Sequence, residues 1–430
     1  MRNILISIIL SLCLSDCALC SDPLSKLIDL RDYFPILFLP SFSDTTSFSG
    51  TTDKGKNIIL SFSGDIMAHD VNFNMKNYNK IYDDVKEFLL SDGLSFGNIE
   101  MPVCDELPLS TYPRFNVHSD YLKAAIDAGF DIFSLANNHT NDQYEQGIHG
   151  TIASFQKLQK DFATKNRLLY ASGVRQKSSD DMQPVFIEKN GFRILFLAVT
   201  EILNSYDMSK RLVYYSSIKD SKSLAKKIQK MREQMPCDLF VLSLHVDEKE
   251  YKRDVLPEKR ERFKLFAKAG ADIIWANHPH VVQGWEEFRI EEDLLIPSFK
   301  NHSSQDIHSS LQQKVKGPLK IRRRAFFMYS LGNFISGQRR NPNLHNPEYY
   351  REYTGDTVLM QLKIKKRNEL GALKMEVHPI LLTVHNGNDG IVIKQFKTEW
   401  MNSLPAIEQN YYKKRFELMK EDTEKEVSKL

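Results

Sequence analysis

Several residues that could bind metal ions stand close behind apolar runs of the sequence. Asp65, His245, His278 and His280 each come within a few residues of the end of such a run. Carboxylates and imidazoles together suit Mn, Zn or Fe, rather than a calcium site or a thiolate zinc site. Two such ions about 4 Å apart can hold a phosphoryl group and lower the pKa of a bridging water. These residue types therefore predict metal-dependent hydrolysis.

Taken singly, most of these residues have an ordinary structural explanation. A Gly-Asp pair after a strand is usually a turn, and the Asn-Asn-His at 137–139 could cap a helix. His245 could be a buried histidine with satisfied hydrogen bonds. His278 and His280 are poorly explained by core packing, because they flank Pro279, which stiffens the segment. The joint occurrence of these residues is harder to explain without a common site.

The apolar runs themselves have the length and composition of β-strands. They are 58–62, 130–136, 193–199, 239–244, 272–276 and 326–331. Helices are predicted at 119–128 and 257–269, each followed by a glycine, and further strands at 357–364 and 373–382. Such alternation predicts an α/β fold built in layers. Because ligands bind beyond the carboxyl ends of strands in such folds, the motifs that follow these runs should converge.

The polar motifs occur in a fixed order along the chain. They are Gly64-Asp65-Ile66-Met67, Gly97-Asn98-Ile99-Glu100, Asn137-Asn138-His139, Ser243-Leu244-His245, His278-Pro279-His280-Val281 and Ser330-Leu331-Gly332-Asn333-Phe334. This order resembles that of the CapA (poly-γ-glutamate capsule biosynthesis) family within the calcineurin-like metallophosphoesterase superfamily. The resemblance covers roughly residues 57–395 and implies a layered α/β sandwich of the calcineurin-like metallophosphoesterase type.

By this resemblance, the site would hold two divalent metal ions. The implied metal ligands are Asp65, Glu100, Asn138, His245, His278 and His280. Asp65 would bind the first ion and Glu100 would bridge the two. His139 would be catalytic, acting as a general acid or as a hydrogen-bond donor to the oxygens of the transition state.

The chain also departs from the family pattern near these ligands. The superfamily often has a histidine two residues after the first aspartate, where this chain has Met67. Nearby His69 is expected to be a solvent-facing helix residue rather than a ligand. The family usually has Gly-His where this chain has Ala276-Asn277, and Trp-Gly where it has Val246-Asp247. None of these three departures affects a residue of the implied ligand set.

The first 20 residues have the pattern of an export signal. Arg2 precedes an uncharged, mostly apolar stretch at 4–14, which Asp16 ends. A spanning helix needs about 20 apolar residues. We therefore expect an exported protein, periplasmic or at the cell surface. Because no clean cleavage site follows, an uncleaved anchor or a lipidated cysteine remains open, and either would associate the chain with the membrane.

The rest of the chain divides by composition. Residues 21–56 are predicted to be a linker, 57–395 the metallophosphoesterase-like domain, and 396–430 a charged, exposed helical tail. After cleavage two cysteines would remain, Cys104 and Cys237, which we expect to be free and buried.

A polar, basic segment at 286–325 interrupts the alternation of strands and helices and is interpreted as an insertion. Its basic residues include Lys300, Lys314, Lys316, Lys320, Arg322, Arg323 and Arg324. Both ends adjoin strands that face the predicted site, so we expect a lid or rim that favours an anionic substrate. The alternative is a surface loop whose charges keep it soluble.

The overall charge of the chain argues against nucleic acid as a partner. The 430 residues include 58 basic and 55 acidic side chains, for a formal net charge of +3, which gives no global signature of nucleic-acid binding. An anionic polymer or a phosphoester is the expected substrate. The resemblance implies a hydrolase that synthesises, attaches or exports a poly-γ-glutamate-like surface polymer. The alternatives are a phosphoesterase acting on a nucleotide or lipid-linked phosphate outside the cytoplasm, and a non-catalytic metal-binding scaffold.

Overall fold

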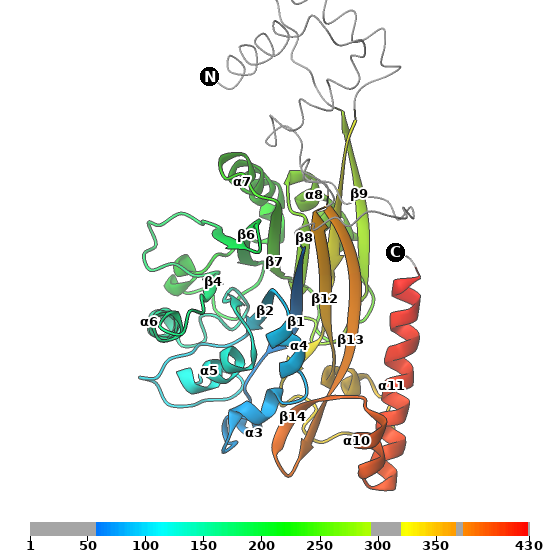
Figure 1. The fold of residues 1–430 in the computed structure, drawn as a ribbon. Coiled ribbons are helices and arrows are strands. Elements are labelled where there is room, and N and C mark those ends of the chain that lie inside the picture. The colour runs from blue at the N-terminus through cyan, green and yellow to red at the C-terminus, as the bar shows by residue number, and fades with distance from the viewer. Residues whose placement is uncertain (1–56, 294–319, 367–372, 429–430) are drawn as a thin grey trace, which may run out of the picture.

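Two β-sheets form the centre of the molecule (Figure 1). The computed structural model describes residues 57–293, 320–366 and 373–428. The first sheet contains β1 (Asn57–Ile66), β2 (Leu94–Ile99), β3 (Ile132–Ser134), β4 (Tyr170–Ser172), β11 (Asn333–Ile335), β12 (Asp356–Lys366), β13 (Leu373–Gly387) and β14 (Gly390–Gln395). The second contains β5 (Val185–Lys189), β6 (Phe192–Thr200), β7 (Leu239–His245), β8 (Ile273–Asn277), β9 (Trp285–Asp293) and β10 (Lys320–Met328).

Both sheets contain a block of parallel strands, which reaches one edge of the first sheet and occupies the middle of the second. The first sheet has the order β14-β13-β12-β1-β2-β3-β4, in which β1 to β4 run parallel and β12 to β14 add antiparallel neighbours. The second has the order β5-β6-β7-β8-β10-β9, in which β6, β7, β8 and β10 run parallel. Since parallel strands end at one edge of a sheet, the segments that follow β1, β2, β3, β7 and β8 can meet.

The two sheets pack against each other through large aromatic side chains. The rings of Phe62 and Phe96 stack with centroids 4.5 Å apart, and Trp275 of β8 lies 5.8 Å from Phe62. The Trp275 Nε1 also donates a hydrogen bond of 2.8 Å to the carbonyl oxygen of Ser63. Buried aromatic rings contribute much of the apolar area of a core. Trp275 therefore fixes the second sheet against the end of β1, next to Asp65.

Helices cover the outer face of each sheet (Figure 1). The helices are α3 (Asp70–Phe73), α4 (Lys86–Ser91), α5 (Ser119–Ala128), α6 (Tyr144–Ala163), α7 (Ser221–Gln234), α8 (Pro257–Ala269), α10 (Thr398–Ser403) and α11 (Ala406–Val427), with 3-10 turns at Tyr78–Tyr82, Met208–Leu212, Ile218–Asp220 and Tyr350–Gly355. Helices α5 and α6 pack on the first sheet, and α7 and α8 on the second. The predicted α/β sandwich is confirmed. Helix α5 ends as predicted, because Gly129 adopts φ 134 directly after it.

The described ends of segment 286–325 form an antiparallel ribbon of β9 and β10. Strand β10 runs parallel to β8 with Phe326 opposite Ile273, so Lys320 lies beyond the amino end of β8. The predicted ligands follow the carboxyl end of that strand. Arg323 is buried and donates to the carbonyl of Ala271 and, at 2.9 Å, to Asp272 Oδ1.

The predicted lid is therefore wrong for residues 320–325, which leave the sheet at the end opposite the predicted site. The error arose because a strand rich in arginine does not look like a strand in the sequence. Lys300, Lys314 and Lys316 lie outside the described residues.

The C-terminal segment is helical, as predicted, but one face of α11 is buried. Tyr411, Tyr412 and Arg415 are at most 1% exposed, and Arg415 Nε donates to Asp356 Oδ2 at 2.9 Å. The expectation of an exposed tail is therefore wrong for this face of α11. Arg415 can be buried there because the buried carboxylate of Asp356, in the first sheet, accepts its hydrogen bond. Among the helices of the described ranges, none is long and apolar enough to cross a membrane. The predicted signal at 1–20 and the linker at 21–56 lie outside these ranges.

The two cysteines in the described part of the chain are free and buried, as predicted. Cys104 lies in the segment after β2, and Cys237 lies directly before β7. Burial raises the pKa of the Cys237 thiol to about 11. This thiol is therefore protonated at neutral pH and behaves as an apolar core side chain.

Candidate metal centre

Asp65 lies at the end of β1, where the backbone of another strand comes very close. A Cβ atom at position 64 would lie 1.8 Å from the carbonyl oxygen of Gly332, so the position accepts only glycine. That same carbonyl accepts the backbone N–H of Asp65 at 3.0 Å. The Asp65 side chain is fully buried, and its Oδ1 accepts a hydrogen bond of 2.8 Å from Asn98 Nδ2. One carboxylate is thus fixed at this strand end.

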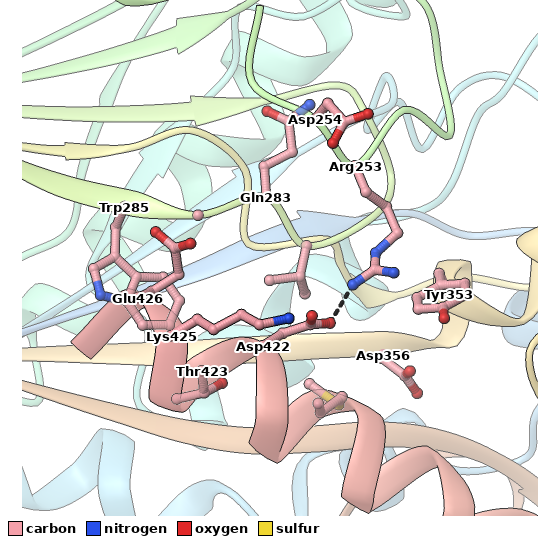
Figure 2. Close-up of a pocket in the computed structure, with 13 residues that line it drawn as sticks. Arg253, Asp254, Gln283, Trp285, Tyr353, Asp356, Asp422, Thr423, Lys425 and Glu426 are labelled. Carbon is pink, nitrogen blue, oxygen red and sulfur yellow. Dashed lines mark hydrogen bonds and ion pairs between the residues drawn. The ribbon is translucent and has the colours of Figure 1, made fainter. Parts of the chain in front are cut away.

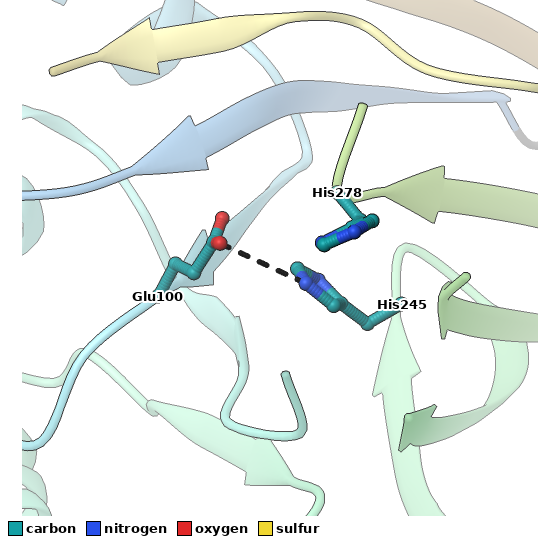
Figure 3. Close-up of side chains that lie close together, drawn as sticks. All are labelled: Glu100, His245 and His278. Atoms are coloured by element: carbon teal, nitrogen blue, oxygen red, sulfur yellow. Dashed lines mark ion pairs between the residues drawn. The ribbon is translucent and has the colours of Figure 1, made fainter. Parts of the chain in front are cut away.

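Glu100 follows β2 directly and is also fully buried. Neither of its carboxylate oxygens has a hydrogen-bond partner among the described residues. Its Oε1 lies 3.7 Å from Nε2 of both His245 and His280. Figure 3 shows the carboxylate on the side of the imidazoles of His245 and His278. Burial, and then the charge of Asp65, raise the pKa of Glu100 well above its usual value. A buried carboxylate without partners is costly, so the arrangement favours a bound cation.

Asn138 and His245 meet across the two sheets. The Asn138 Oδ1 lies 2.9 Å from His245 Nε2, although the two residues are 107 positions apart in the chain. Neighbouring Asn137 fixes this turn, because its Nδ2 donates to the carbonyl of Ile99 at 2.7 Å. Burial, and then the proximity of His278, lower the pKa of His245 well below its usual value. The ring is therefore neutral, which is the state that binds a metal ion.

His278 and His280 follow β8 on a backbone with positive φ angles of 108° and 60°. Residues other than glycine rarely adopt such angles, which cost roughly 1–3 kcal/mol each. The His278 Nε2 bonds to the carbonyl of Glu248 at 3.1 Å, while its Nδ1 has no partner among the described residues. Burial, and then His280, lower the pKa of His278 to about 4. The fold therefore holds a neutral imidazole in a strained position.

His280 is oriented by two oxygen atoms on its Nδ1 side. The Asn333 Oδ1 lies 2.9 Å from this nitrogen and the Asp65 Oδ2 lies 3.3 Å from it. Burial lowers the pKa of His280, but the hydrogen bond and charge of Asp65 outweigh it, so the pKa is raised. A proton on Nδ1 leaves the lone pair of Nε2 directed toward Glu100. A hydrogen bond from the ring nitrogen that does not bind the metal is typical of metal-binding histidines.

The six predicted ligands thus lie in one buried cluster. Ligand atoms of Asp65, Glu100 and His280 lie within 4.8 Å of one another, as do those of Glu100, His245 and His278. Glu100 belongs to both groups, as a bridging ligand would, and Asn138 adjoins the second. The unpartnered oxygens and nitrogens and the mixed donor set fit divalent metal ions. Metal binding itself stays a prediction.

His139 is buried beside this cluster and is held by a carboxylate. Its Nδ1 lies 2.7 Å from Asp142 Oδ2, and the ring of Phe115 packs edge-on with centroids 4.7 Å apart. The same Oδ2 accepts the backbone N–H of Phe115 at 2.8 Å. Asp142 therefore directs the proton of His139 to Nδ1. Sequence reasoning missed Asp142, although its spacing of three residues from His139 was visible.

His69 is half-buried, so the expectation of a solvent-facing residue is wrong. Its Nδ1 accepts the backbone N–H of Gly337 at 3.0 Å, and its ring packs edge-on against Phe115 with centroids 5.1 Å apart. Burial, and then the charge of His280, lower the pKa of His69 to about 4. Within the described ranges it belongs to none of the potential metal-ligand groups.

A third potential ligand group contains Glu250, which sequence reasoning did not single out. Its carboxylate lies within 4.8 Å of ligand atoms of His278 and His280. Burial would raise the pKa of Glu250, but the charge of His280 outweighs burial, so the pKa is lowered. The only sign of Glu250 in the sequence is that an acidic residue stands five positions after His245.

A separate hollow of about 310 Å³ lies between α11 and the segment that leads into β9 (Figure 2). Its lining includes Trp285, Tyr353 and the ion pair of Arg253 with Asp422. It contains none of the six predicted ligands. The hollow is therefore distinct from the candidate metal centre.

Comparison with known proteins identifies relatives of this chain. The model of the family described as "Bacterial capsule synthesis protein PGA_cap" matches residues 59–338. The capsule biosynthesis protein CapA of Bacillus anthracis is 27% identical over 247 residues, which cover 55% of this chain and 57% of that protein. The PGA biosynthesis protein CapA of Bacillus subtilis (strain 168) is 23% identical over 358 residues, which cover 80% of this chain and 78% of that protein.

Two solved structures also align with the chain. The calcineurin-like phosphoesterase YfkN from Bacillus subtilis aligns with a TM-score of 0.38 and 11% identity, covering 83% of this chain and 98% of that one. A hypothetical protein from Thermus thermophilus aligns with a TM-score of 0.37 and 12% identity, covering 75% of this chain and 99% of that one.

Proposed function

The chain belongs to the bacterial capsule synthesis family PGA_cap, and from this premise we propose that it is an exported, metal-dependent hydrolase that acts on an anionic surface polymer. The polymer class is that of poly-γ-glutamate, and the step is its synthesis, attachment or export. The observation that carries the proposal is the buried carboxylate of Glu100, which lies between imidazoles and has no hydrogen-bond partner in the described part of the chain.

The residues divide into two sets around Glu100. Asp65 and His280 would hold one divalent ion, and Asn138, His245 and His278 the other, with Glu100 shared by both. Two such ions, when bound, would activate water and neutralise charge on the substrate. The low pKa of His278, about 4, keeps it neutral and able to bind metal across the physiological range.

His139 is the residue proposed to move a proton. Asp142 accepts from Nδ1 at 2.7 Å, so Nε2 is the ring nitrogen left to donate to a leaving group when the ring is protonated. The carboxylate also stabilises that protonated ring, as in other acid–base pairs of histidine and aspartate. The packing of Phe115 against the ring excludes water from one side. These contacts support a general-acid role.

Cationic and aromatic groups near the site support an anionic substrate. The ring of Tyr251 lies 6.3 Å from that of His280, and the guanidinium of half-buried Arg351 lies 4.5 Å above the Tyr251 ring. An arginine held in this way can bind carboxylate or phosphate. The relatives named for capsule and PGA biosynthesis favour a carboxylate polymer over a simple phosphoester.

Export is proposed from the pattern of residues 1–20. A reporter enzyme fused after residue 60 should become active outside the cytoplasm. Activity confined to the cytoplasm would contradict this part of the proposal. Extraction of membranes with salt and then with detergent separates a free protein from an anchored one.

Metal analysis of the purified full chain, combined with a hydrolysis screen, tests the proposal. We expect bound Mn, Zn or Fe and metal-dependent cleavage of a γ-glutamyl polymer, lost in Glu100→Gln and kept in Glu106→Gln, a change of an exposed acid nearby. Cleavage of phosphoesters alone would instead identify a phosphoesterase. A protein that binds metal but cleaves neither class, yet is required for the polymer, would be a scaffold.

A further inference from the structure

We propose that Glu250 is a further metal ligand, whose carboxylate binds a divalent cation together with His278 and His280. The inference rests on the proposed metal-dependent function. It concerns a residue in the segment after β7, where this chain has Val246-Asp247 directly after His245. It adds one carboxylate to the six ligands predicted from the sequence.

The geometry of the three side chains carries the proposal. One ligand atom from each of Glu250, His278 and His280 lies within 4.8 Å of the others. His278 is 3% exposed, and its Nδ1 has no partner among the residues that the structure describes. A buried ring nitrogen without a partner is rare in a folded protein. A cation between this ring and a carboxylate would satisfy both groups.

Backbone hydrogen bonds on both sides of Glu250 hold it against these histidines. The carbonyl of Glu248 bonds to His278 Nε2 at 3.1 Å, and the N–H of Tyr251 donates to the carbonyl of Pro279 at 2.9 Å. Tyr251 has a φ of 65°, a strained value for a residue other than glycine. The position of the Glu250 carboxylate is therefore set by the backbone and not by a freely moving surface loop.

A buried lysine of helix α8 also holds the segment after β7 in place. Lys259 of α8 is 1% exposed, and its Nζ bonds at 2.7 Å to Glu248 Oε1, to Gln283 Oε1 and to the carbonyl of Tyr329. These bonds link the segment after β7 with the segment after β8. A ligand presented by such an anchored segment loses little conformational entropy when it binds a cation.

Glu250 and Glu100 reach the two histidines from different directions. Of the potential ligand groups found within the described ranges, none contains both carboxylates, whereas each of them is grouped with His278 and with His280. Glu250 therefore supplies a carboxylate oxygen to a ligand group, that of His278 and His280 together, in which Glu100 takes no part. The coordination of the centre would gain a carboxylate without competition between the two acids.

Calorimetric titration of the metal-stripped full chain with Mn²⁺, and separately with Zn²⁺, tests the inference. Removal of even an indirect ligand contact costs about 10- to 100-fold in metal affinity, so Glu250→Gln should weaken binding at least tenfold. Asp247→Asn is the matched control, because it removes the same charge from an exposed residue of the same segment. Equal affinities in Glu250→Gln and Asp247→Asn would overturn the proposal.

A crystal of the wild-type protein soaked in Mn²⁺ supplies the second measurement. Anomalous scattering should place an ion about 2.0–2.2 Å from a Glu250 oxygen, the usual carboxylate distance. Ions found only beyond 4 Å from Glu250 would overturn the inference even if its substitution weakened binding. Wild-type protein that binds Mn²⁺ through Glu250 but hydrolyses nothing would refute the proposed function alone. Wild-type protein that binds neither ion would refute both.

Discussion

The candidate metal centre and the contact between α11 and the first sheet are both built around a buried carboxylate. Asp356, at the start of β12, is 2% exposed and Glu100 is fully buried. The Asp356 Oδ1 accepts from Arg339 Nη1 at 2.7 Å and its Oδ2 accepts from Arg415 Nε at 2.9 Å. Glu100 accepts no hydrogen bond from any described residue.

This difference distinguishes a structural acid from a proposed metal ligand. A buried ion is tolerated when the protein itself supplies its partners, as Arg339 and Arg415 do for Asp356. A buried ion without partners indicates that something outside the chain completes it. Equal burial therefore does not indicate equal function, and the hydrogen-bond partners decide which acid binds a ligand.

The largest expected effect is that of Glu100→Gln on metal binding. Structural zinc held by four ligands is bound by roughly 10–16 kcal/mol, so one ligand represents roughly 2.5–4 kcal/mol, or on the order of 100-fold in affinity. The stability of the metal-free protein should stay the same or rise, because a buried acid whose ionisation is costly is replaced by a neutral amide. Asp356→Asn should instead lower the unfolding free energy and leave the metal affinity unchanged. Calorimetric titration and urea unfolding measure the two quantities, and equal destabilisation of both variants would break the comparison.

An effect of similar size, on stability rather than on metal binding, concerns the paired acid Asp356. Arg415→Met leaves Asp356 buried with one cationic partner fewer, which should cost about 3–5 kcal/mol of unfolding free energy. Metal content should not change. The matched control is Lys413→Met on the exposed face of α11, which should stay within about 0.5 kcal/mol of wild type. An Arg415→Met protein as stable as the control would mean that the ion pair contributes nothing.

A smaller effect is expected where an acid positions a catalytic group. Asp142→Asn should lower turnover about 10- to 100-fold, the usual cost of losing a supporting hydrogen bond, with metal content unchanged. Asp161→Asn, on the exposed face of α6, is the control. Unchanged turnover in Asp142→Asn would remove Asp142 from the mechanism.

The smallest effect is the pH dependence of the metal-free protein. The pKa of Glu100 is raised by burial and by Asp65, so the folded chain binds its proton more tightly than the unfolded chain does. This contribution to stability is complete below the unfolded pKa of about 4.5 and is lost as the pH rises through the folded pKa.

Wild type should therefore lose stability relative to Glu100→Gln as the pH rises from about 4.5, by at most about 1.4 kcal/mol per pH unit. Urea unfolding of both proteins at stepped pH measures the difference. A constant difference across this range would show that Glu100 is ionised in the metal-free fold. Added metal should abolish the trend, because binding displaces the proton.

The sequence predicted the centre well where local chemistry determines structure. Asp65, His245 and His280 follow strands whose carboxyl ends must meet, so their convergence could be expected before any coordinates. Helix α8 begins at Pro257 and ends before Gly270, as the sequence predicted, because proline favours a first helical turn and glycine a left-handed end.

The remaining features depend on contacts between distant segments. The run of basic residues hid the start of β10 in the sequence, since Arg323 is buried only because Asp272 and nearby carbonyls accept its hydrogen bonds. The buried face of α11 was missed for the same reason, because its arginine needs Asp356. Glu250 is placed by backbone bonds to the 278–280 segment, which no local pattern encodes.

The division of the centre between the two sheets has a consequence for its assembly. The oxygen donors Asp65, Glu100 and Asn138 belong to the first sheet, and the imidazoles belong to the second, more than 100 residues later in the chain. The first sheet is itself completed only by β12, β13 and β14, which follow the imidazoles. During synthesis, the predicted ligands in the early part of the chain would thus offer oxygen atoms alone, a set that favours hard ions such as magnesium over zinc. Binding of a softer ion at the proposed centre would have to wait until these long-range strand pairs form, which is a slow step in folding.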